Sequence, residues 1–378
     1  MAAFDLAVVG GGPVGASLVR ALDGLSIAFI APAPERASAA GFDPRVYALS
    51  PGNVEFLRAL GVWQEIAAER LARVEAMRIF GDDPRAVLEF DAYEAGVREL
   101  AWIVEDSALQ RALWSGLSGM ALRCERLEVG AEHVVVSFSE GAPLAAKLVI
   151  GADGAQSFVR GAAGIAARER SYGQVAVVAN FHCSKPHGNV AYQWFQGGAV
   201  LALLPLPGDQ VSMVWSLPES EGHRIGQMSG EALAGEVERA SHGALGTLAA
   251  ASPVRSFPLQ RLAARRLVAP RVALAGDAAH VVHPLAGQGL NLGLQDARAL
   301  SAVIAGREPG RDPGDERLLR RYERARAEPI LAMDGAISGL FALYGADNAF
   351  VGRARNAGLN LTNRMTVLKN LLMRQAMT

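Results

Sequence analysis

The sequence GGGPVG at residues 10–15 has the glycine spacing of a phosphate-binding turn. A continuous apolar run predicts a buried strand directly before it, at residues 4–9, and the residues after it predict a helix and then a second strand at 26–31. In such a unit the first glycine makes the tight turn, the second admits a pyrophosphate close to the backbone, and the third lets the helix pack on the sheet. The helix N-terminus adds N–H donors and positive potential. The segment therefore predicts a dinucleotide site formed by Gly10, Gly12, Pro13, Val14 and Gly15.

The second strand lacks the acidic residue that usually follows it in dinucleotide-binding folds, about 20 residues after the glycines, where it binds the ribose hydroxyls. The strand ends at Ile30-Ala31-Pro32, and the nearest acid, Glu35, lies past a proline-rich turn. Two interpretations of Glu35 stay open, a ribose contact and a solvated loop charge. The missing acid predicts weaker retention of the dinucleotide.

Two further glycine-containing turns follow predicted strands. GADGAQS at 151–157 leads from a strand into a helix, and Asp153 either braces this turn beside a cofactor or has a purely structural role. In AGDAAH at 275–280, Asp277 ends a strand and is placed to accept a hydrogen bond from a ribose or ribityl hydroxyl. The loop HPLAGQGLN at 283–291 can lie flat against a ring system, and the next helix points its N-terminus at that ring, which favours negative charge on it. The predicted contacts are Gly276, Asp277, Pro284, Gly287, Gln288, Gly289, Leu290 and Asn291.

The spacing of His280 and His283 is that of a metal-binding pair, but the sequence offers no evident third ligand, so we predict no metal site. The two cysteines, Cys124 and Cys183, lie far apart and form no CxxC pair. We therefore expect both to be small buried or half-buried hydrophobic residues in a reducing cytoplasm. The N-terminal residues MAAFDLAVVGGG lack a basic n-region, so no signal peptide is expected.

Composition excludes several classes of protein. The 378 residues carry a net charge of −1, whereas dedicated nucleic-acid binders carry a surplus of positive charge, so we expect no nucleic-acid partner. With 51% hydrophobic residues the chain is too apolar to be disordered, and no apolar run reaches the roughly 18 residues of a membrane-spanning helix. The length predicts two domains or one large interleaved unit.

The order of the expected elements indicates an α/β fold in which a β-rich segment interrupts a dinucleotide-binding unit. After the first βαβ unit, periodicity predicts a helix at 53–72, hairpin strands at 74–102 and a helix at 107–117, which is capped by Asp106 or Ser107. Three strands at 121–150 and four strands at 172–218 follow. The remaining predicted elements are a helix at 229–250, a strand at 267–276, a helix at 289–304 and helices from 315. We predict a Rossmann-like domain at 1–72, 103–170 and 265–315, a β-sheet-rich substrate domain at 73–102 and 171–264, and C-terminal helices at 316–378.

In this order and at these spacings, GGGPVG, GADGAQS and GDAAH resemble the turns of the FAD-dependent aromatic hydroxylases, the class A flavoprotein monooxygenases. The run HPLAGQGLNLGLQD at 283–296 looks like the signature of their ubiquinone-biosynthesis hydroxylase family. The resemblance covers nearly the whole chain, because it extends to DPR at 43–45, ALS at 48–50, YQWF at 192–195, Arg353, Asn356, Gly358, Leu359 and Lys369.

The resemblance implies the aromatic hydroxylase fold, with a Rossmann-like FAD-binding domain interleaved with a β-sheet-rich substrate domain. It implies an enzyme that binds FAD non-covalently, takes electrons from NAD(P)H or another reductant, and uses O₂ to hydroxylate the aromatic ring of a polyprenylated phenol. In that family the oxygen comes from a flavin C4a-hydroperoxide, which needs a dry site. The resemblance also implies that Arg45 and Gln110 contact the FAD phosphates or ribityl chain and that Asp277 binds the ribityl chain. It assigns no general base.

Several alternatives stay open. One is a non-catalytic or weakly FAD-binding scaffold in a quinone-biosynthesis complex, and another is a related monooxygenase acting on a soluble aromatic. A basic amphipathic stretch is either a docking surface for the inner face of a membrane or for other ubiquinone-biosynthesis enzymes, or a solvated helix face; it contains Arg353, Arg355, Arg364, Lys369 and Arg374. The sequence indicates neither the oligomeric state nor the ring carbon that is hydroxylated.

Overall fold

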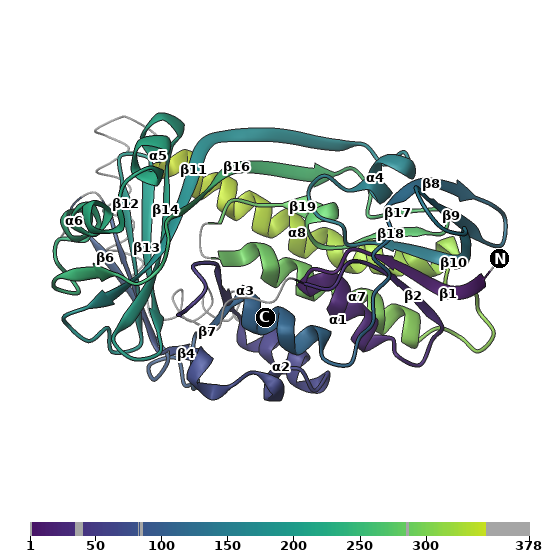
Figure 1. The fold of residues 1–378 in the computed structure, drawn as a ribbon, viewed down its shortest axis with the longest axis horizontal. Coiled ribbons are helices and arrows are strands. Elements are labelled where there is room, and N and C mark those ends of the chain that lie inside the picture. Colours follow the sequence, from purple (N-terminus) through teal and green to yellow (C-terminus); the bar gives the residue numbers. More distant parts are fainter. Residues whose placement is uncertain (1, 35–40, 82, 84–85, 285–286, 345–378) are drawn as a thin grey trace.

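The computed structural model describes residues 2–34, 41–81, 83, 86–284 and 287–344. Within this part, two large β-sheets lie toward opposite ends of an elongated molecule, and long helices run between them (Figure 1). None of the described helices is both long enough and apolar enough to cross a membrane. The predicted C-terminal helical region begins as a helix, but residues 345–378 lie outside the described part.

The first sheet contains a run of parallel strands in the order β18-β10-β1-β2, with antiparallel strands at its margins. Its strands are β1 (Ala2–Val9), β2 (Ile27–Ile30), β8 (Cys124–Val129), β9 (Val134–Phe138), β10 (Leu144–Gly151), β17 (Val268–Ala269) and β18 (Val272–Leu274). The associated helices are α1 (Pro13–Ala21), α2 (Pro51–Ala59), α3 (Asp106–Trp114), α4 (Phe158–Ala162), α7 (Gln288–Ala305) and α8 (Glu316–Tyr344), with 3₁₀ turns at Trp63–Glu65, Ala68–Arg70 and Gly276–Ala278.

The register of the first sheet brings the three predicted glycine turns together. Val9 at the end of β1 lies opposite Gly151 at the end of β10, and Gly151 lies opposite Leu274 at the end of β18. Because parallel strands end at one edge of a sheet, the segments that follow these residues emerge side by side. The apolar run in β1 is buried on both faces, as the sequence predicts, since residues 6–9 are all buried.

The second sheet has nine strands and follows the path β19-β16-β11-β14-β13-β12-β5-β6, with β15 paired to β11. Helices α5 (Glu219–Gly226) and α6 (Gly230–Ala240) contribute to its core. The strands are β5 (Ala76–Phe80), β6 (Val87–Asp91), β11 (Ala167–Cys183), β12 (Val190–Gln196), β13 (Ala199–Leu206), β14 (Gln210–Pro218), β15 (Leu248–Ala250), β16 (Arg255–Ala264) and β19 (His280–Val281).

Side chains alternate strictly across the centre of this sheet. On one face, residues such as Val177, Leu201 and Trp215 share a core with Ile225 of α5 and Leu233 of α6. Their neighbours in sequence line a cavity on the other face, because successive residues of a strand point to opposite sides. The second sheet thus has one face committed to its own core and one face available to a ligand.

The two sheets are interleaved along the chain. The long strands β11 and β16 of the second sheet pair with each other and arch from near α4 to the remaining strands of that sheet (Figure 1). A small third sheet, β3-β7-β4, contains β3 (Val46–Leu49), β4 (Leu71–Val74) and β7 (Ala101–Glu105). We propose that the two large sheets mark the two predicted domains, whose boundaries stay a prediction.

Three sequence predictions need correction. The helix expected at 53–72 ends at Ala59, because Gly61 adopts a left-handed φ of 73° and stops it. The helix expected at 229–250 ends at Ala240, since His242 and Gly243 are left-handed, and β15 follows. Asp106 is the first residue of α3, and its side chain does not cap that helix. Helix α5 was not predicted from the sequence. The two cysteines are free, and they are half-buried and buried as predicted.

Candidate active site

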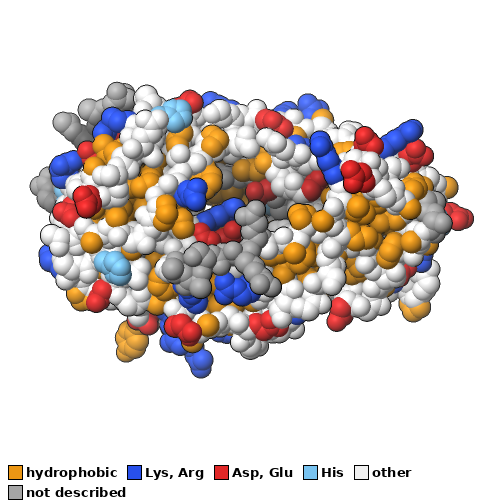
Figure 2. Space-filling view, in the orientation of Figure 1, with side chains coloured by type: hydrophobic (Ala, Val, Ile, Leu, Met, Phe, Trp, Pro, Cys, Tyr) orange, Lys and Arg blue, Asp and Glu red, His pale blue; other side chains and the backbone are white. Residues whose placement is uncertain are grey.

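The four predicted glycine segments meet at one cavity of about 580 Å³. Residues 12–14 line it from the first segment, 154–155 from the second, Asp277 from the third, and 284, 287 and 289–290 from the fourth. The face shown in Figure 2 is hollowed near its centre, where charged and hydrophobic side chains lie close together. Sequence segments separated by more than a hundred residues thus share a single site.

The first glycine turn is closed so tightly that a Cβ on either of two of its glycines would clash with a backbone carbonyl oxygen. A Cβ on Gly10 would lie 2.2 Å from the Ala152 carbonyl oxygen, and one on Gly15 would lie 2.0 Å from the Gly10 carbonyl oxygen. Gly10 also has a φ of 108°, which L side chains rarely adopt. These two glycines hold the turn against the second segment and do not line the cavity.

Gly12 differs from both, because no protein atom lies within 4 Å of where its Cβ would be. It is the N-cap of α1, and no side chain caps that helix. The N-terminus of α7 also lies at the cavity, and its N-cap, Gly287, provides no side-chain cap either. Two helix N-termini therefore present backbone N–H groups and positive potential to one cavity, which suits anionic groups.

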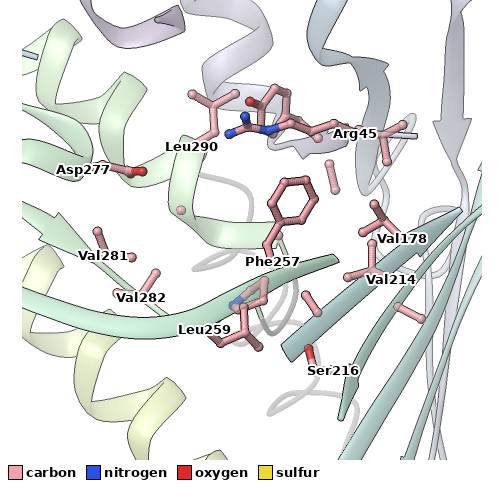
Figure 3. A pocket seen from close by; sticks show the side chains of 18 of the residues that line it. Arg45, Val178, Val214, Ser216, Phe257, Leu259, Asp277, Val281, Val282 and Leu290 are labelled. Carbon is pink, nitrogen blue, oxygen red and sulfur yellow. The ribbon is translucent and has the colours of Figure 1, made fainter. Parts of the chain in front are cut away.

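Two side chains of opposite charge line the polar part of the cavity. Asp277 points into it from the loop after β18, and Arg45 faces it from the segment before β3 (Figure 3). The protein around Asp277 limits its hydration and raises the pKa of the carboxyl, although the charges of His280 and Arg45 partly offset this. Asp277 is thus placed to form hydrogen bonds with hydroxyl groups in the cavity.

Gln110, the other predicted phosphate or ribityl contact, lines the cavity from α3. Its side-chain amide donates to both Asp106 carboxylate oxygens, at 3.0 and 3.1 Å. The Tyr47 hydroxyl donates to the same carboxylate at 2.9 Å. Asp106, which the sequence indicated only as a cap, therefore orients Gln110 at the cavity.

Asp153 braces the second segment through bonds within that segment, which both interpretations of this residue allow. The Asp153 carboxylate accepts hydrogen bonds from the Ser157 hydroxyl and the Val159 backbone N–H. The buried Arg160 donates to the Ala155 carbonyl at 2.8 Å and to the Ala278 carbonyl at 3.0 Å. Arg160 therefore joins the second glycine segment to the third.

Asn291 lies behind the cavity wall. Its side-chain oxygen accepts from the Ser50 backbone N–H and from the Asn53 amide, both at 2.9 Å, and its own amide donates to the Ala48 carbonyl at 2.8 Å. These bonds fasten the start of α7 to the segment between β3 and α2. The side chain of Asn291 is thus engaged by protein groups, unlike a side chain that lines the cavity.

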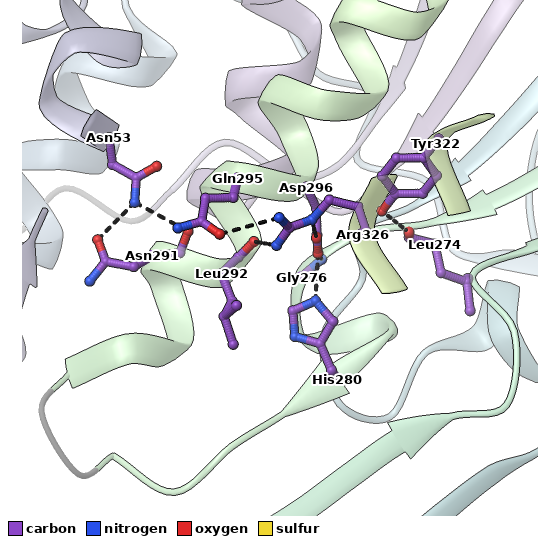
Figure 4. A network of polar contacts seen from close by, with 10 residues as sticks. All are labelled: Asn53, Leu274, Gly276, His280, Asn291, Leu292, Gln295, Asp296, Tyr322 and Arg326. Atoms are coloured by element: carbon purple, nitrogen blue, oxygen red, sulfur yellow. Dashed lines mark hydrogen bonds and ion pairs between the residues drawn. The ribbon is translucent and has the colours of Figure 1, made fainter. Parts of the chain in front are cut away.

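A buried charged network holds the third segment to two helices (Figure 4). One Asp296 carboxylate oxygen accepts from the Gly276 backbone N–H at 2.9 Å and bonds His280 Nε2 at 2.6 Å; the other accepts from Arg326 Nε at 2.6 Å. The side chains of Asp296, His280 and Arg326 are all at most 5% exposed. Burial alone would raise the pKa of Asp296, but His280 and Arg326 outweigh burial and lower it.

The second histidine has a separate environment. His283 Nε2 lies 2.7 Å from the Gln174 side-chain oxygen, and burial lowers the pKa of His283 to about 4. The imidazole is therefore neutral at pH 7 and donates to Gln174. His280 and His283 thus face different partners, and the described residues contain no group of three or more His, Cys, Asp or Glu side chains that could hold a metal ion.

The other half of the cavity is apolar. Its wall is the free face of the second sheet, where small side chains such as Ala176, Val178 and Val214 face inward. Phe257 projects between this wall and the side that carries Asp277 and Leu290 (Figure 3). The cavity thus joins a polar, glycine-lined half to an apolar half formed by the sheet.

The predicted contacts divide into two groups. Ten line the cavity: Gly12, Pro13, Val14, Arg45, Gln110, Asp277, Pro284, Gly287, Gly289 and Leu290. The others that the structure describes do not line it: Gly10, Gly15, Asp153, Gly276, Gln288 and Asn291. Glu35, predicted as either a ribose contact or a solvated loop charge, lies outside the described residues.

Sequence reasoning missed residues that act through distant partners. The Trp114 indole N–H donates to the Gly11 carbonyl at 2.8 Å and so fixes the first turn. Arg326 completes the network around Asp296, and Gln193 and Ser216 place polar groups on the apolar wall. Only the strand alternation around YQWF could have pointed to Gln193, and no local pattern marks the other three.

These residues fit FAD. An open glycine at an uncapped helix N-terminus suits a pyrophosphate, an inward-pointing carboxylate suits a ribityl chain, and the N-terminus of α7 suits an electron-rich ring. The family model described as FAD binding domain matches residues 3–333. A Rhodospirillum rubrum protein named ubiquinone hydroxylase UbiL is 34% identical over 99% of this chain and 89% of its own length. The chain belongs to the FAD-dependent ubiquinone-biosynthesis hydroxylases.

A second member of this family is similar over its full length. Escherichia coli 3-demethoxyubiquinol 3-hydroxylase is 32% identical, covering 99% of this chain and 98% of its own. The structure of p-nitrophenol 4-monooxygenase PnpA from Pseudomonas putida superposes with a TM-score of 0.80 at 19% identity, over 100% of this chain and 99% of that one. The predicted aromatic hydroxylase fold is thereby confirmed. The family model and the two relatives show that the chain is an FAD-dependent monooxygenase.

The open space at Gly12 gives a test of cofactor placement. In Gly12→Ala, the new methyl group meets no protein atom, so the free energy of unfolding without FAD should fall by less than about 1 kcal/mol. The methyl would instead meet the pyrophosphate and raise the Kd for FAD at least about tenfold. Titration followed by flavin fluorescence measures this. Gly24→Ala, also in open space but away from the cavity, should leave the Kd unchanged. An unchanged Kd in Gly12→Ala would place the pyrophosphate elsewhere.

The charged network gives a second test. Asp296→Asn leaves the Arg326 guanidinium buried without its counter-charge, so the free energy of unfolding should fall by about 3 kcal/mol. Urea denaturation measures the loss. Glu316→Gln breaks an ion pair with Arg320 that is exposed on α8, and it should cost less than about 1 kcal/mol. Equal losses in the two variants would contradict the role given to Asp296.

Proposed function

We propose that this enzyme hydroxylates the aromatic ring of a polyprenylated phenol in ubiquinone biosynthesis. The observation that carries the proposal is the composition of the cavity, which joins the FAD half to an apolar wall of alanine and valine side chains. A ring lying on that wall would face the flavin, and the apolar surface suits an uncharged, greasy substrate. The names of the two relatives, a ubiquinone hydroxylase and a demethoxyubiquinol hydroxylase, support the same substrate class.

The chain's own groups would bind FAD, orient it and shield the reacting ring from water. The N-terminus of α1 and Gly12 would hold the pyrophosphate, Asp277 the ribityl chain, and the N-terminus of α7 the electron-rich edge of the ring. When bound, FAD supplies the chemistry that activates O₂ with electrons from NAD(P)H or another reductant. Phe257 and the valines of the second sheet would keep water from the reacting ring.

The membrane association of the chain belongs to the same proposal. A polyprenylated substrate partitions into a bilayer, so the enzyme would have to collect it from a membrane surface or from another ubiquinone-biosynthesis enzyme. The basic, amphipathic sequence between Arg353 and Arg374 supports docking to the inner face of a membrane. This stretch lies outside the described residues.

Mass spectrometry of quinone intermediates tests the pathway. A strain without this protein should accumulate a prenylphenol that lacks one hydroxyl group, and the wild-type gene should restore the normal quinone. The Asp277→Ala variant should fail to restore it, whereas a non-catalytic scaffold would still work with that change. A normal quinone pool in the deletion strain would favour a soluble aromatic substrate instead.

The apolar wall is tested by filling it. Ala202 faces the cavity from β13, so Ala202→Phe would occupy the space for the ring. Hydroxylation should fall at least about 100-fold, because the substrate can no longer reach its reacting position. The Kd for FAD should stay within about twofold, since Ala202 lies in the other half. Ala202→Ser, in which the new side chain is close to alanine in size, should keep most activity. Product formation and flavin fluorescence report the two effects, and a fully active Ala202→Phe would exclude this wall as the ring site.

A further inference from the structure

Two polar side chains interrupt the otherwise apolar wall of the cavity. The wall residues contributed by β11 to β14 are mostly alanine, valine and leucine, and the exceptions with side chains on this face are Gln193 and Ser216. Tyr192 also borders the cavity, but its ring stacks on Trp194 in the core of the opposite face. A carboxamide and a hydroxyl are therefore placed where the neighbouring side chains offer only methyl groups.

Strand register places Gln193 at the end of an apolar row. Gln193 on β12 lies opposite Ala202 on β13, Ala202 lies opposite Val214 on β14, and Val214 lies opposite Val178 on β11. All four residues line the cavity. A planar ring lying on the three apolar side chains would bring a substituent at its edge toward the carboxamide.

The Gln193 carboxamide forms no hydrogen bond within the described part of the chain, although the residue is only 8% exposed. The fully enclosed polar atoms that lack a partner do not include those of Gln193, so its carboxamide keeps some exposure, and the residue lines the cavity. A nearly buried amide without a partner is costly, and a ligand that supplies one recovers that cost.

We propose that Gln193 determines substrate specificity by hydrogen bonding to the ring hydroxyl of the phenol. This inference rests on the proposed function, because it assumes that a phenolic ring lies on the wall. The carboxamide can accept from a hydroxyl and donate to its oxygen, so it recognises an un-ionised phenol without adding charge to a dry pocket. A site built to hydrogen-bond a hydroxyl discriminates strongly against an analogue that lacks it.

The test compares two probes on the FAD-loaded full chain. One is a 2-prenylphenol, and the other is the matching prenylbenzene, which lacks the hydroxyl. Binding is followed by the change in flavin absorbance, and turnover by mass spectrometry of the hydroxylated product. The wild type should bind the phenol at least about tenfold more tightly than the benzene. In Gln193→Leu the ratio of the prenylbenzene Kd to the prenylphenol Kd should fall to near one, and the Kd for the prenylbenzene should not rise.

Matched variants separate specificity from damage to the fold. Gln196→Leu removes a glutamine from the same strand, whose amide donates to the Ala240 carbonyl away from the cavity, and it should keep the wild-type ratio. Gln193→Met, an apolar side chain of nearly the same length, should lose the preference for the phenol as well, which covers the case in which leucine is not tolerated.

Three outcomes would overturn the proposal. A Gln193→Leu protein that binds FAD and keeps the wild-type ratio removes the role of Gln193 while leaving the proposed function intact. If Ser216→Ala abolishes the preference for the phenol and Gln193→Leu does not, the hydrogen bond to the ring hydroxyl belongs to Ser216. A wild type that binds and hydroxylates neither probe, although it binds FAD, rejects both the inference and the proposed function.

Discussion

The buried carboxylate of Asp296 is the constraint on which the site depends. A charge without access to water is tolerated only when it is fully paired, and Asp296 meets this condition through Gly276, His280 and Arg326. These partners come from the loop after β18, from β19 and from α8, while Asp296 itself is in α7. The need to satisfy one carboxylate therefore fixes the loop that carries Asp277 relative to two long helices. The Tyr322 hydroxyl, which donates to the Leu274 carbonyl, adds a further bond between α8 and the sheet.

The same arrangement explains why one cavity combines two chemistries. The edge of the parallel sheet supplies glycine turns, helix N-termini and Asp277, all suited to a polar, charged cofactor. The free face of the second sheet supplies alanine and valine side chains, suited to an apolar ring. The paired strands β11 and β16 connect these parts, so one strand pair fixes the polar half of the cavity relative to the apolar half. Loops alone would position the two halves less firmly.

Local signals in the sequence were enough to predict the parts that depend on the backbone. The glycine turns at 10–15, 151–154 and 276 follow strands whose apolar runs are evident, so their places in the sequence could be predicted. Helix ends were harder, because the left-handed residues at Gly61 and His242 stop patterns that otherwise continue. A period of apolar residues shows that a helix exists more reliably than it shows where the helix ends.

The remaining site residues could not be predicted, because their roles depend on partners far away in the sequence. Asn291 was expected at the cavity, yet its side chain bonds Ser50 and Asn53, more than two hundred residues earlier. Trp114 fixes Gly11, and Arg326 reaches Asp296, with nothing in their neighbourhoods to indicate it. Gln193 gains its meaning only from the neighbouring strands, since the register decides that it faces a row of apolar side chains.

The most direct measurement of the central claim is the origin of the oxygen atom in the product. The purified chain, loaded with FAD, would receive a reductant, a prenylphenol and ¹⁸O₂, and the product would be analysed by mass spectrometry. The account predicts a ring-hydroxylated phenol that carries one ¹⁸O atom. Consumption of the reductant with only hydrogen peroxide formed, or a product whose new oxygen comes from water, would contradict it.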